Sequence, residues 1–324
     1  IVFDNIKQKI ILIVNMSLND LETEYNKAVI KLNRLIDLLC NGKKKNELGG
    51  KLLGKVTPLF NKEQFCNMVK KAKYHIHEGD IFQIVLSNQL SAPFEGSLLN
   101  TYRILRIINP SPYMFYFSGT DVEIAGASPE TLVKLENGIL HTFPLAGTRP
   151  RGKNKKEDKA LEIKLLSDEK ELAEHNMLVD LGRNDLGKIA VHGSVTVPTY
   201  LTIERYQFVM HLVSVVTAKL KPGHTAMDAL KATLPAGTVS GAPKIRAMTR
   251  IYQWETVKRS IYAGAVGFLG QNDQADFAIA IRTMVVKDNQ AHVQAGAGIV
   301  YDSNPTSEYF ETLQKAKALM EVGQ

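Results

Sequence analysis

Two pairs of glutamates have the spacing that directs carboxylates to one face of a helix. Glu171 and Glu174 form one pair, and Glu308 and Glu311 form the other. Residues three positions apart share a helix face, and like charges at this spacing repel unless they are solvated or neutralised by a cation. Four carboxylates on two helices are hard oxygen ligands that suit Mg²⁺. The alternative is two solvated helix faces, which is the commoner use of glutamate.

Two glycine-rich segments lie beside predicted strands, at residues 235–244 and 294–298. Glycine lets backbone N–H groups approach an anion closely, and Pro243 suits the first turn of a helix whose N-terminus favours negative charge. Neither segment has the spacing of a Walker loop or of a dinucleotide-binding fingerprint. The two segments predict either an anion-binding backbone or tight turns with close strand packing.

Three polar residues interrupt apolar strands: Gln83, His211 and Arg282. A buried guanidinium needs a carboxylate or an anionic ligand, and a histidine in such a place is a candidate acid, base or hydrogen-bond donor. Glu130 directly follows a strand, where burial would raise its pKa and make it a general acid. Taken singly, each of these residues also fits a solvated or otherwise satisfied side chain.

The elements that must position these residues form clusters of strands between groups of helices. This order favours an α+β layered domain over a doubly wound parallel sheet, in which strands and helices alternate. A long helix is predicted over 160–181, after a charged loop over 149–159. The last strands, including one over 277–287, are predicted as an antiparallel meander across 260–301.

The N-terminal stretch is predicted as strand followed by helix. Residues 1–14 are rich in Ile and Val, and Ser17 opens an amphipathic helix in which Asp20 completes a weak capping box. A basic, glycine-rich linker follows at 43–54, and Asn61 begins the next helix with a capping-box pattern.

The 324-residue chain has an ordinary globular composition, which excludes a disordered or collagen-like protein. Its net charge is +7, and two windows, 43–51 and 149–159, account for the entire excess, so the charge does not indicate a nucleic-acid-binding face. The two cysteines, Cys40 and Cys66, cannot form a disulfide framework and favour a reducing, cytoplasmic location. No apolar run approaches the ~18 residues that a membrane span needs.

A series of segments occurs in order from about residue 60 to the end, and together they resemble the chorismate-utilising enzyme family. The similarity is closest to the branch of this family that makes anthranilate. The segments are 79–83, 109–114, 128–130, 144–152, 174–181, 183–186, 203–206, 234–244 and 294–303.

The resemblance implies an α+β fold, an α/β layered sandwich of two antiparallel sheets packed together with helices outside and the site between them. Residues 1–55 are then expected to be a remnant of an N-terminal region, and residues 56–324 the chorismate-binding catalytic domain. Because the chain opens at Ile1 as if in mid-strand, we expect that it lacks part of the region that completes a tryptophan feedback site. Feedback inhibition is accordingly expected to be impaired.

The resemblance also assigns roles to single residues. Glu130 corresponds to the general acid that protonates the departing C4 hydroxyl of chorismate, and His211 to the histidine needed to eliminate pyruvate. In the family, Mg²⁺ bridges the two glutamate pairs and the ring carboxylate, with Glu174 and Glu311 as principal ligands. The implied substrate contacts are Gly147, Thr148, Thr238, Tyr262, Arg282, Gly296 and Gly298. The implied remnant of the feedback site is Asn109, Pro110, Pro112, Tyr113 and Met114.

Two positions distinguish the branches of the family. Water-using members carry a lysine that activates water where this chain has Gln83, and an ammonia nucleophile needs no such base. The aminodeoxychorismate branch carries a nucleophilic lysine where this chain has Ala146, and alanine offers no nucleophile. The expected reaction is attack of ammonia at C2 of chorismate, loss of the C4 hydroxyl and elimination of pyruvate. The product would be anthranilate, and the reaction would be the first step of tryptophan biosynthesis.

A glutamine amidotransferase partner usually supplies ammonia to such enzymes. This chain has no Gly-x-Cys-x-Gly elbow of its own, so a separate partner chain, and with it a hetero-oligomer, is expected. Two alternatives remain: an aminodeoxychorismate synthase, which keeps the pyruvyl group, and a catalytically dead chorismate-binding module. A nucleic-acid binder is the least favoured class, because it would need a basic face with exposed aromatic residues.

Overall fold

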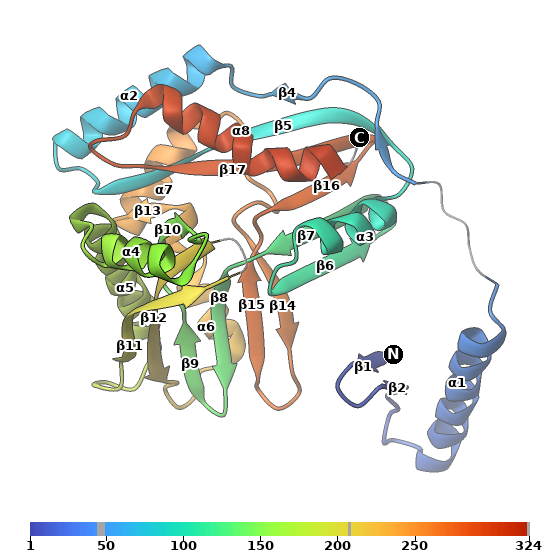
Figure 1. Cartoon of the computed structure of the whole chain (residues 1–324). Coiled ribbons are helices and arrows are strands. Elements are labelled where there is room, and N and C mark those ends of the chain that lie inside the picture. Colours follow the sequence, from blue (N-terminus) through green and yellow to red (C-terminus); the bar gives the residue numbers. More distant parts are fainter. Residues whose placement is uncertain (44–48, 207–208, 323–324) are drawn as a thin grey trace. The chain divides into compact units, whose positions relative to one another are not determined.

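The computed structural model describes residues 1–43, 49–206 and 209–322. The chain divides into two compact units, Ile1–Leu48 and Gly49–Gln324, and each is described by itself (Figure 1). Part of the predicted linker at 43–54 lies outside the described residues. Among the described helices, none has the length and apolar character that crossing a bilayer requires.

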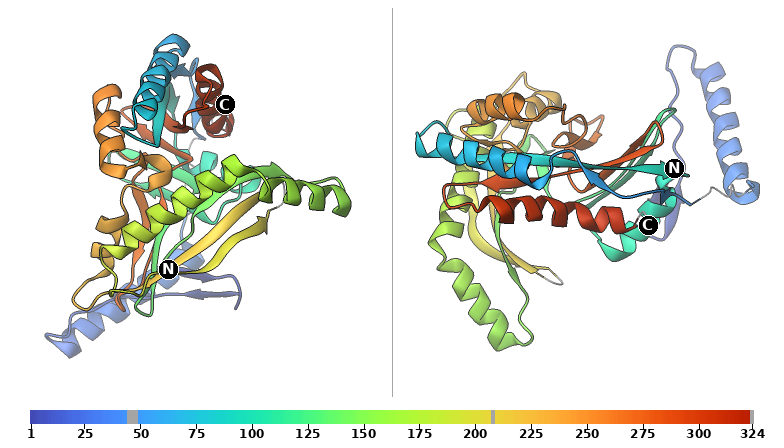
Figure 2. Two further views of the ribbon diagram at one scale, coloured as in Figure 1. Left: turned by 90° about the vertical axis from the view of Figure 1, so that its left-hand side faces the viewer. Right: turned by 90° about the horizontal axis from the view of Figure 1, so that it is seen from above.

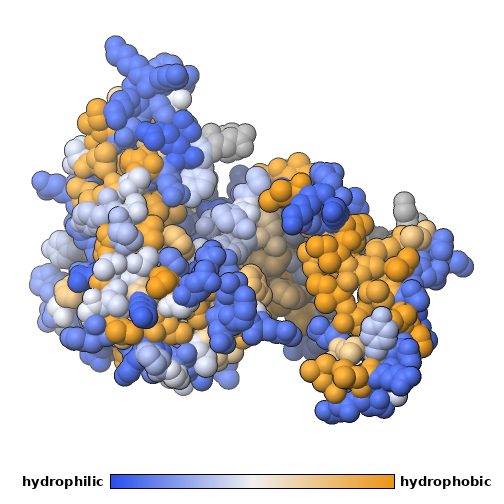
Figure 3. All heavy atoms as spheres, turned by 90° about the horizontal axis from the view of Figure 1, so that it is seen from below, coloured by the Kyte–Doolittle hydropathy of each residue, from blue (hydrophilic) through white to orange (hydrophobic). Residues whose placement is uncertain are grey.

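The first unit contains β1 (Val2–Asp4), β2 (Lys9–Ile11) and helix α1 (Leu21–Asn41). The two strands form an antiparallel hairpin. The helix begins at Leu21 and not at Ser17 as predicted, because the Asp20 side chain accepts a hydrogen bond from the Thr23 N–H and so caps the helix at that point. No described residue of α1 is buried, and Figure 3 shows apolar side chains gathered on the surface of this unit.

The second unit contains an eight-stranded antiparallel sheet in the order β13-β5-β17-β16-β7-β6, with β3 and β4 also paired to β5. Helices α2, α3, α7 and α8 bury apolar side chains against it, and Figure 1 shows α2 and α8 lying along β5 and β17. The strands are β3 (Lys51–Leu52), β4 (Thr57–Pro58), β5 (Gln83–Glu95), β6 (Tyr113–Ser118), β7 (Val122–Ser128), β13 (Gly241–Ala242), β16 (Thr283–Lys287) and β17 (Gln290–Ile299). The helices are α2 (Lys62–His77), α3 (Leu98–Ile108), α7 (Lys244–Trp254) and α8 (Pro305–Val322).

A seven-stranded antiparallel sheet completes the second unit, in the order β10-β12-β9-β8-β15-β14, with β11 also paired to β12. Helices α5 and α6 pack against it around one apolar cluster, and α4 packs against β12 in another. The strands are β8 (Thr131–Glu136), β9 (Ile139–Thr142), β10 (Leu145–Pro150), β11 (Thr196–Arg205), β12 (Val209–Lys219), β14 (Ala265–Leu269) and β15 (Ala275–Ile279). The helical elements are α4 (Lys155–Leu166), α5 (Glu169–Gly187), α6 (Ala226–Thr233) and the short 3₁₀ helix η1 (Gly237–Val239).

The helix predicted over 160–181 is two helices. The first, α4, begins inside the predicted charged loop, because Asn154 caps its N-terminus. The chain breaks at Ser167, and Asp168 caps the second helix, α5, by accepting from the Glu171 N–H. In Figure 2, α5 follows α4 as a bent run of helix. The break sets the direction of α5 independently of α4, and α5 carries the first glutamate pair.

The strand predicted over 277–287 is also two strands, and they belong to different sheets. β15 pairs with β8 in the seven-stranded sheet, and β16 pairs with β7 in the eight-stranded sheet. The predicted meander is therefore wrong at this point. Arg282 lies at the change of sheet with φ of 49°, a left-handed conformation that interrupts a strand.

Candidate active site

Glu130 and Arg282 lie at two neighbouring points where the chain passes from one sheet to the other. Glu130 lies between β7 and β8, and Arg282 lies between β15 and β16. Because β7 pairs with β16 and β8 pairs with β15, the two crossings run side by side. The Arg282 carbonyl accepts from the Ala127 N–H at 3.1 Å, and the Glu130 carbonyl accepts from the Ile279 N–H at 3.0 Å. The fold therefore places an acid beside a guanidinium at the junction of the two sheets.

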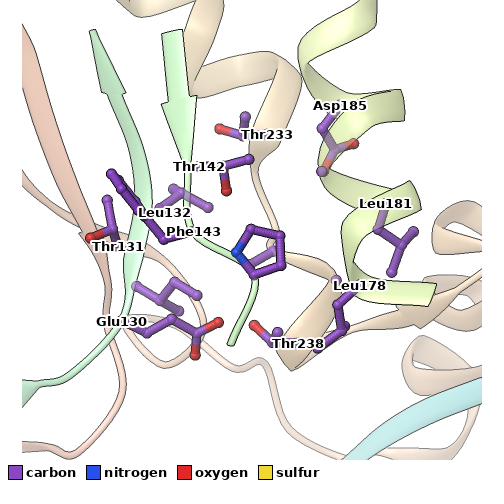
Figure 4. Close-up of a pocket in the computed structure, with 15 residues that line it drawn as sticks. Glu130, Thr131, Leu132, Thr142, Phe143, Leu178, Leu181, Asp185, Thr233 and Thr238 are labelled. Carbon is purple, nitrogen blue, oxygen red and sulfur yellow. The ribbon is translucent and has the colours of Figure 1, made fainter. Parts of the chain in front are cut away.

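The surroundings of Glu130 make its carboxyl a proton donor near neutral pH. Desolvation by burial raises its pKa to about 7, while the Thr238 hydroxyl, Lys315 and Arg282 act in the opposite direction. Figure 4 shows Glu130 and Thr238 beside a small cavity of about 40 Å³, which α5 and β8 also line. A cavity of this size suits one or two water molecules and is too small for an organic substrate.

A second cavity of about 380 Å³ also reaches Glu130, and its volume suits a small organic molecule. Arg282, His211 and Tyr206 contribute to its lining. Desolvation lowers the pKa of Arg282 and Glu130 opposes this effect, so the guanidinium is a largely desolvated cation with one acidic neighbour. A desolvated guanidinium that lines a cavity of this size favours a ligand that carries a carboxylate.

The predicted remnant of the feedback site borders this second cavity. The members that lie in the lining are Asn109, Pro110 and Pro112. The next two residues open β6, where the Tyr113 hydroxyl donates to Asp276 Oδ1 at 2.8 Å and Met114 packs into the apolar cluster of α3 and α8. Tryptophan binding by this segment stays a prediction.

His211 lies on β12 opposite Thr148 of β10. Its Nδ1 is 3.1 Å from the Gly147 carbonyl and 3.0 Å from the Thr148 hydroxyl. A carbonyl only accepts, so Nδ1 carries the proton and Nε2 of the neutral ring keeps a free lone pair. Desolvation is the largest cause of a lowered pKa at His211, which keeps the ring neutral at pH 7. Nε2 is therefore a candidate base.

Gly147 occupies an irregularity in the pairing of β10 with β12, where the register shifts between Ala146 and Thr148. Its φ is 66°, which favours glycine, and a Cβ there would lie 3.2 Å from Glu171 Oε2. Ala146 is buried beside it and is 7% exposed. This glycine thus allows β10 to approach the first glutamate pair.

Two glycines of β17 leave room for two buried polar side chains. A Cβ at Gly298 would lie 2.7 Å from Gln83 Nε2, and a Cβ at Gly296 would lie 2.6 Å from Tyr262 Oη. Burial raises the pKa of Tyr262 to about 12, so its hydroxyl remains protonated and able to donate. Gln83 is 4% exposed, and its Oε1 has no hydrogen-bond partner among the described residues. An unpaired amide oxygen is unfavourable in a protein interior, which points to a ligand that donates to it.

The two glutamate pairs lie near the N-terminal ends of α5 and α8. Desolvation raises the pKa of Glu174, and Glu171 and Glu311 raise it further. Desolvation likewise raises the pKa of Glu308, with a further contribution from Glu311. Carboxylates that oppose one another's ionisation are a setting that a divalent cation relieves, and their hard oxygens fit Mg²⁺.

Two basic side chains that the sequence patterns did not single out bind these carboxylates. Lys315 Nζ lies 2.7 Å from Glu311 Oε1, and Arg149 Nη1 lies 3.1 Å from Glu171 Oε1. Within the part of the chain that the structure describes, no three His, Cys, Asp or Glu side chains form a ready-made metal-binding group. The i,i+4 spacing of Glu311 and Lys315 is a sequence signal for the first contact, whereas nothing in the sequence pattern connects Arg149 with Glu171.

Lys315 also connects the glutamates with the acid. Its Nζ donates to the Gly296 carbonyl at 3.0 Å, and its charge lowers the pKa of both Glu130 and Glu174. The charge of Glu130 also contributes to the raised pKa of Tyr262. Lys315 therefore acts on the glutamates, on the acid and on the glycine-rich strand.

The comparisons with known proteins identify the family of the chain. The family described as chorismate binding enzyme matches residues 1–321. The chain belongs to this family. Anthranilate synthase component 1 of Acetivibrio thermocellus is 50% identical over 336 residues, which cover 99% of this chain and 67% of the relative. The corresponding protein of Lactococcus lactis is 51% identical over 327 residues, which cover 100% of this chain and 71% of the relative.

Solved structures of chorismate enzymes have the same fold. Anthranilate synthase component I from Streptococcus pneumoniae superposes with a TM-score of 0.87 at 49% identity, covering 98% of this chain and 71% of the other. MenF, the menaquinone-specific isochorismate synthase from Escherichia coli, superposes with a TM-score of 0.79 at 25% identity, covering 92% of this chain and 69% of the other. The predicted family and fold class are confirmed.

Proposed function

We propose that the chain is the catalytic component of an anthranilate synthase, a Mg²⁺-dependent lyase that converts chorismate and ammonia into anthranilate, pyruvate and water. One observation carries the proposal: Glu130, with a pKa of about 7, lies beside Arg282 at a substrate-sized cavity, and Gln83 and Ala146 supply no lysine for the competing reactions. The two relatives named anthranilate synthase component 1 support it.

Substrate binding follows from the buried donors of the site. Arg282 pairs with the enolpyruvyl carboxylate, and the protonated Tyr262 hydroxyl donates to the same group. Backbone near Gly296 and Gly298, together with Gly147, Thr148 and Thr238, is assigned to further substrate contacts. The cationic and neutral donors match the two carboxylates that chorismate carries.

In the first step, ammonia attacks C2 of the ring. The Gln83 Oε1 accepts an N–H of ammonia, which holds the nucleophile and leaves its lone pair free to attack. A C2–N bond forms, the two ring double bonds shift from C1=C2 and C5=C6 to C1=C6 and C4=C5, and the C4–O bond breaks, while the new ammonium group releases one proton to solvent. Glu130 donates its proton to the departing oxygen, which leaves as water.

In the second step, the ring becomes aromatic. Nε2 of His211 removes the proton from C2, because the Nδ1–H is held by the Gly147 carbonyl. The C3–O bond then breaks, and the enolpyruvyl group leaves as pyruvate after its methylene carbon takes up a proton. Anthranilate remains.

The residues that would hold Mg²⁺ are Glu174 and Glu311, with Glu171 and Glu308 in support. When bound, the ion supplies positive charge that anchors the ring carboxylate of chorismate. The positions of these carboxylates determine where the ion would bind. Lys315 pairs with Glu311 and Arg149 pairs with Glu171, so both basic side chains would have to release or share their carboxylates with the ion.

We further propose that ammonia comes from a separate glutamine amidotransferase chain in a hetero-oligomer. The relatives carry the name component 1, which supports a second component. The chain alone should use ammonium salts.

Product analysis tests this function. The purified chain is incubated with chorismate, Mg²⁺ and ¹⁵N-ammonium, and the products are identified by mass spectrometry. We expect ¹⁵N-anthranilate and free pyruvate. A labelled product that keeps the pyruvyl group and carries its nitrogen at C4, located by NMR because the C2-aminated intermediate has the same mass, would instead identify an aminodeoxychorismate synthase. Unchanged chorismate bound to the protein would identify a catalytically dead module.

A further inference from the structure

Arg259 lies on the segment between α7 and β14, and no role has been assigned to it above. Its guanidinium donates to both carboxylate oxygens of Glu255, with Nε–Oε2 at 2.8 Å and Nη2–Oε1 at 2.6 Å. The Glu255 side chain is 4% exposed and that of Arg259 is 16% exposed. The free-energy cost of desolvating such a pair can exceed the gain from its attraction. A contribution to stability therefore does not by itself explain why the pair is buried.

The same guanidinium joins two segments of the candidate active site. Nη1 donates to the Val239 carbonyl at 2.6 Å, and Nη2 donates to the Val85 carbonyl at 2.7 Å. Val239 directly follows Thr238 in η1, and Val85 lies in β5, which begins at Gln83. A displacement of the guanidinium would therefore move the backbone beside both residues.

Arg259 also supports Tyr262. Its Cζ lies 5.5 Å from the centre of the Tyr262 ring, in cation–π geometry, and its carbonyl accepts from the Tyr262 N–H at 3.0 Å. The Tyr262 hydroxyl at the other end of this ring lies against Gly296. One side chain thus contacts three segments that carry candidate substrate contacts.

The carboxylate of Glu255 extends the network to the large sheet. Its Oε1 accepts from both the N–H and the hydroxyl of Ser87 at 2.9 Å, and Ser87 in turn accepts from Gln294 Nε2 at 2.7 Å. A lysine at position 259 would keep the charge but could not reproduce the planar fork that serves Glu255 and two carbonyls together.

We propose that Arg259 is a positioning residue, which fixes Gln83, Thr238 and Tyr262 relative to one another through Glu255 and two backbone carbonyls. The proposal rests on the proposed function, because these three residues are assigned to substrate there.

Arg259→Lys tests the proposal. We expect kcat to fall about 100-fold, as for a displacement of about 1 Å at a catalytic site, with a smaller rise in KM for chorismate. The matched control is Arg250→Lys: two N–H groups of Arg250 donate to Asp80 Oδ2 at 3.0 and 2.9 Å, and its side chain is 18% exposed. The control should keep kcat within about twofold.

Hydrogen exchange provides a readout that does not depend on turnover. Peptides that cover residues 83–88 and 236–242 should exchange faster in Arg259→Lys than in the wild type and in the control, while Tm changes little. Glu255→Gln, which keeps the volume and removes the charge, should reproduce both effects if Arg259→Lys does not fold. If the wild type makes no anthranilate, the proposed function fails and the exchange result still tests the positioning. Wild-type kcat with wild-type exchange in both peptides, or equal losses in Arg259→Lys and Arg250→Lys, would overturn the proposal.

Discussion

Lys315 Nζ lies 2.7 Å from Glu311 Oε1 and donates to the Gly296 carbonyl at 3.0 Å, so one ammonium joins the second glutamate pair to the glycine-rich strand. The two side chains are 49% and 47% exposed, and an ion pair in such a setting is only weakly stabilising. A divalent cation that binds Glu311 must share or displace this ammonium.

Removing the ammonium should therefore strengthen metal binding. Lys315→Met is expected to tighten the affinity for Mg²⁺ in the absence of chorismate by about two- to fivefold. This change corresponds to the free energy of the half-exposed ion pair that the ion no longer has to break. Titration calorimetry measures this directly. The control is Lys317→Met, because Lys317 pairs with Glu321 at 3.4 Å on the same helix with a similar i,i+4 spacing. Equal affinities in the two variants would contradict the competition between Lys315 and the metal.

The pH dependence of turnover should report Glu130. The general acid must be protonated, and its pKa is raised to about 7, so kcat should fall as the pH rises above about 7 when free ammonia is held constant. Glu130→Gln should lower kcat by about 10²- to 10⁴-fold and remove this limb, with KM for chorismate nearly unchanged. A limb that persists in the variant would assign the titration to another group.

The same shift affects stability in a defined direction. The folded-state pKa of Glu130 lies above its ordinary value of 4.5, so folding favours the protonated form. Its contribution to the free energy of unfolding is full below about pH 4.5 and is lost as the pH rises through about 7. Urea titrations should show that Glu130→Gln gains stability relative to the wild type as the pH increases across this window.

His211→Met should separate the two steps of the reaction. Without the Nε2 base, the C2 proton cannot be removed efficiently, so the aminated intermediate that still carries the pyruvyl group should accumulate. Mass spectrometry of the quenched reaction detects it. The control is His77→Met at the end of α2, where the side chain is 68% exposed. Full release of pyruvate by His211→Met would remove this residue from the mechanism.

Gly298→Ala should disturb the ammonia contact with little effect on the fold. The new Cβ would lie 2.7 Å from Gln83 Nε2, so the amide has to move. We expect KM for ammonium to rise by about tenfold or more, because one hydrogen bond to ammonia is lost. KM for chorismate should change less. Gly187→Ala is the control, because nothing lies within 4 Å of its Cβ position. Steady-state kinetics, with ammonium and chorismate varied separately, measures the two KM values.

Local sequence signals predicted individual elements well. The Asn61 and Gln64 capping box opens α2 as expected. Such features depend on a few neighbouring residues, so they can be recognised without the fold. The break before Asp168 has no signal in the sequence, because the apolar and charged pattern continues across it.

The relations between distant residues could not be predicted from spacing. The strand at 277–287 divides because it must leave one sheet for the other at Arg282, which is a property of the pairing with β7 and β8. The burial of Arg259 likewise depends on β5 and η1, far away in the sequence. The roles of Glu130, His211 and the four glutamates came from family resemblance, and they remain predictions that the geometry supports.

In the proposed reaction, one site aminates chorismate and then removes its side chain. The most direct measurement follows anthranilate fluorescence and pyruvate release together, with wild-type chain, chorismate, ammonium and Mg²⁺. We expect equal amounts of the two products, formed only when both ammonium and Mg²⁺ are present, and no product from Glu130→Gln on the same timescale. A folded, Mg²⁺-saturated wild-type chain that leaves chorismate unchanged, or that releases pyruvate without anthranilate, would contradict the proposed reaction.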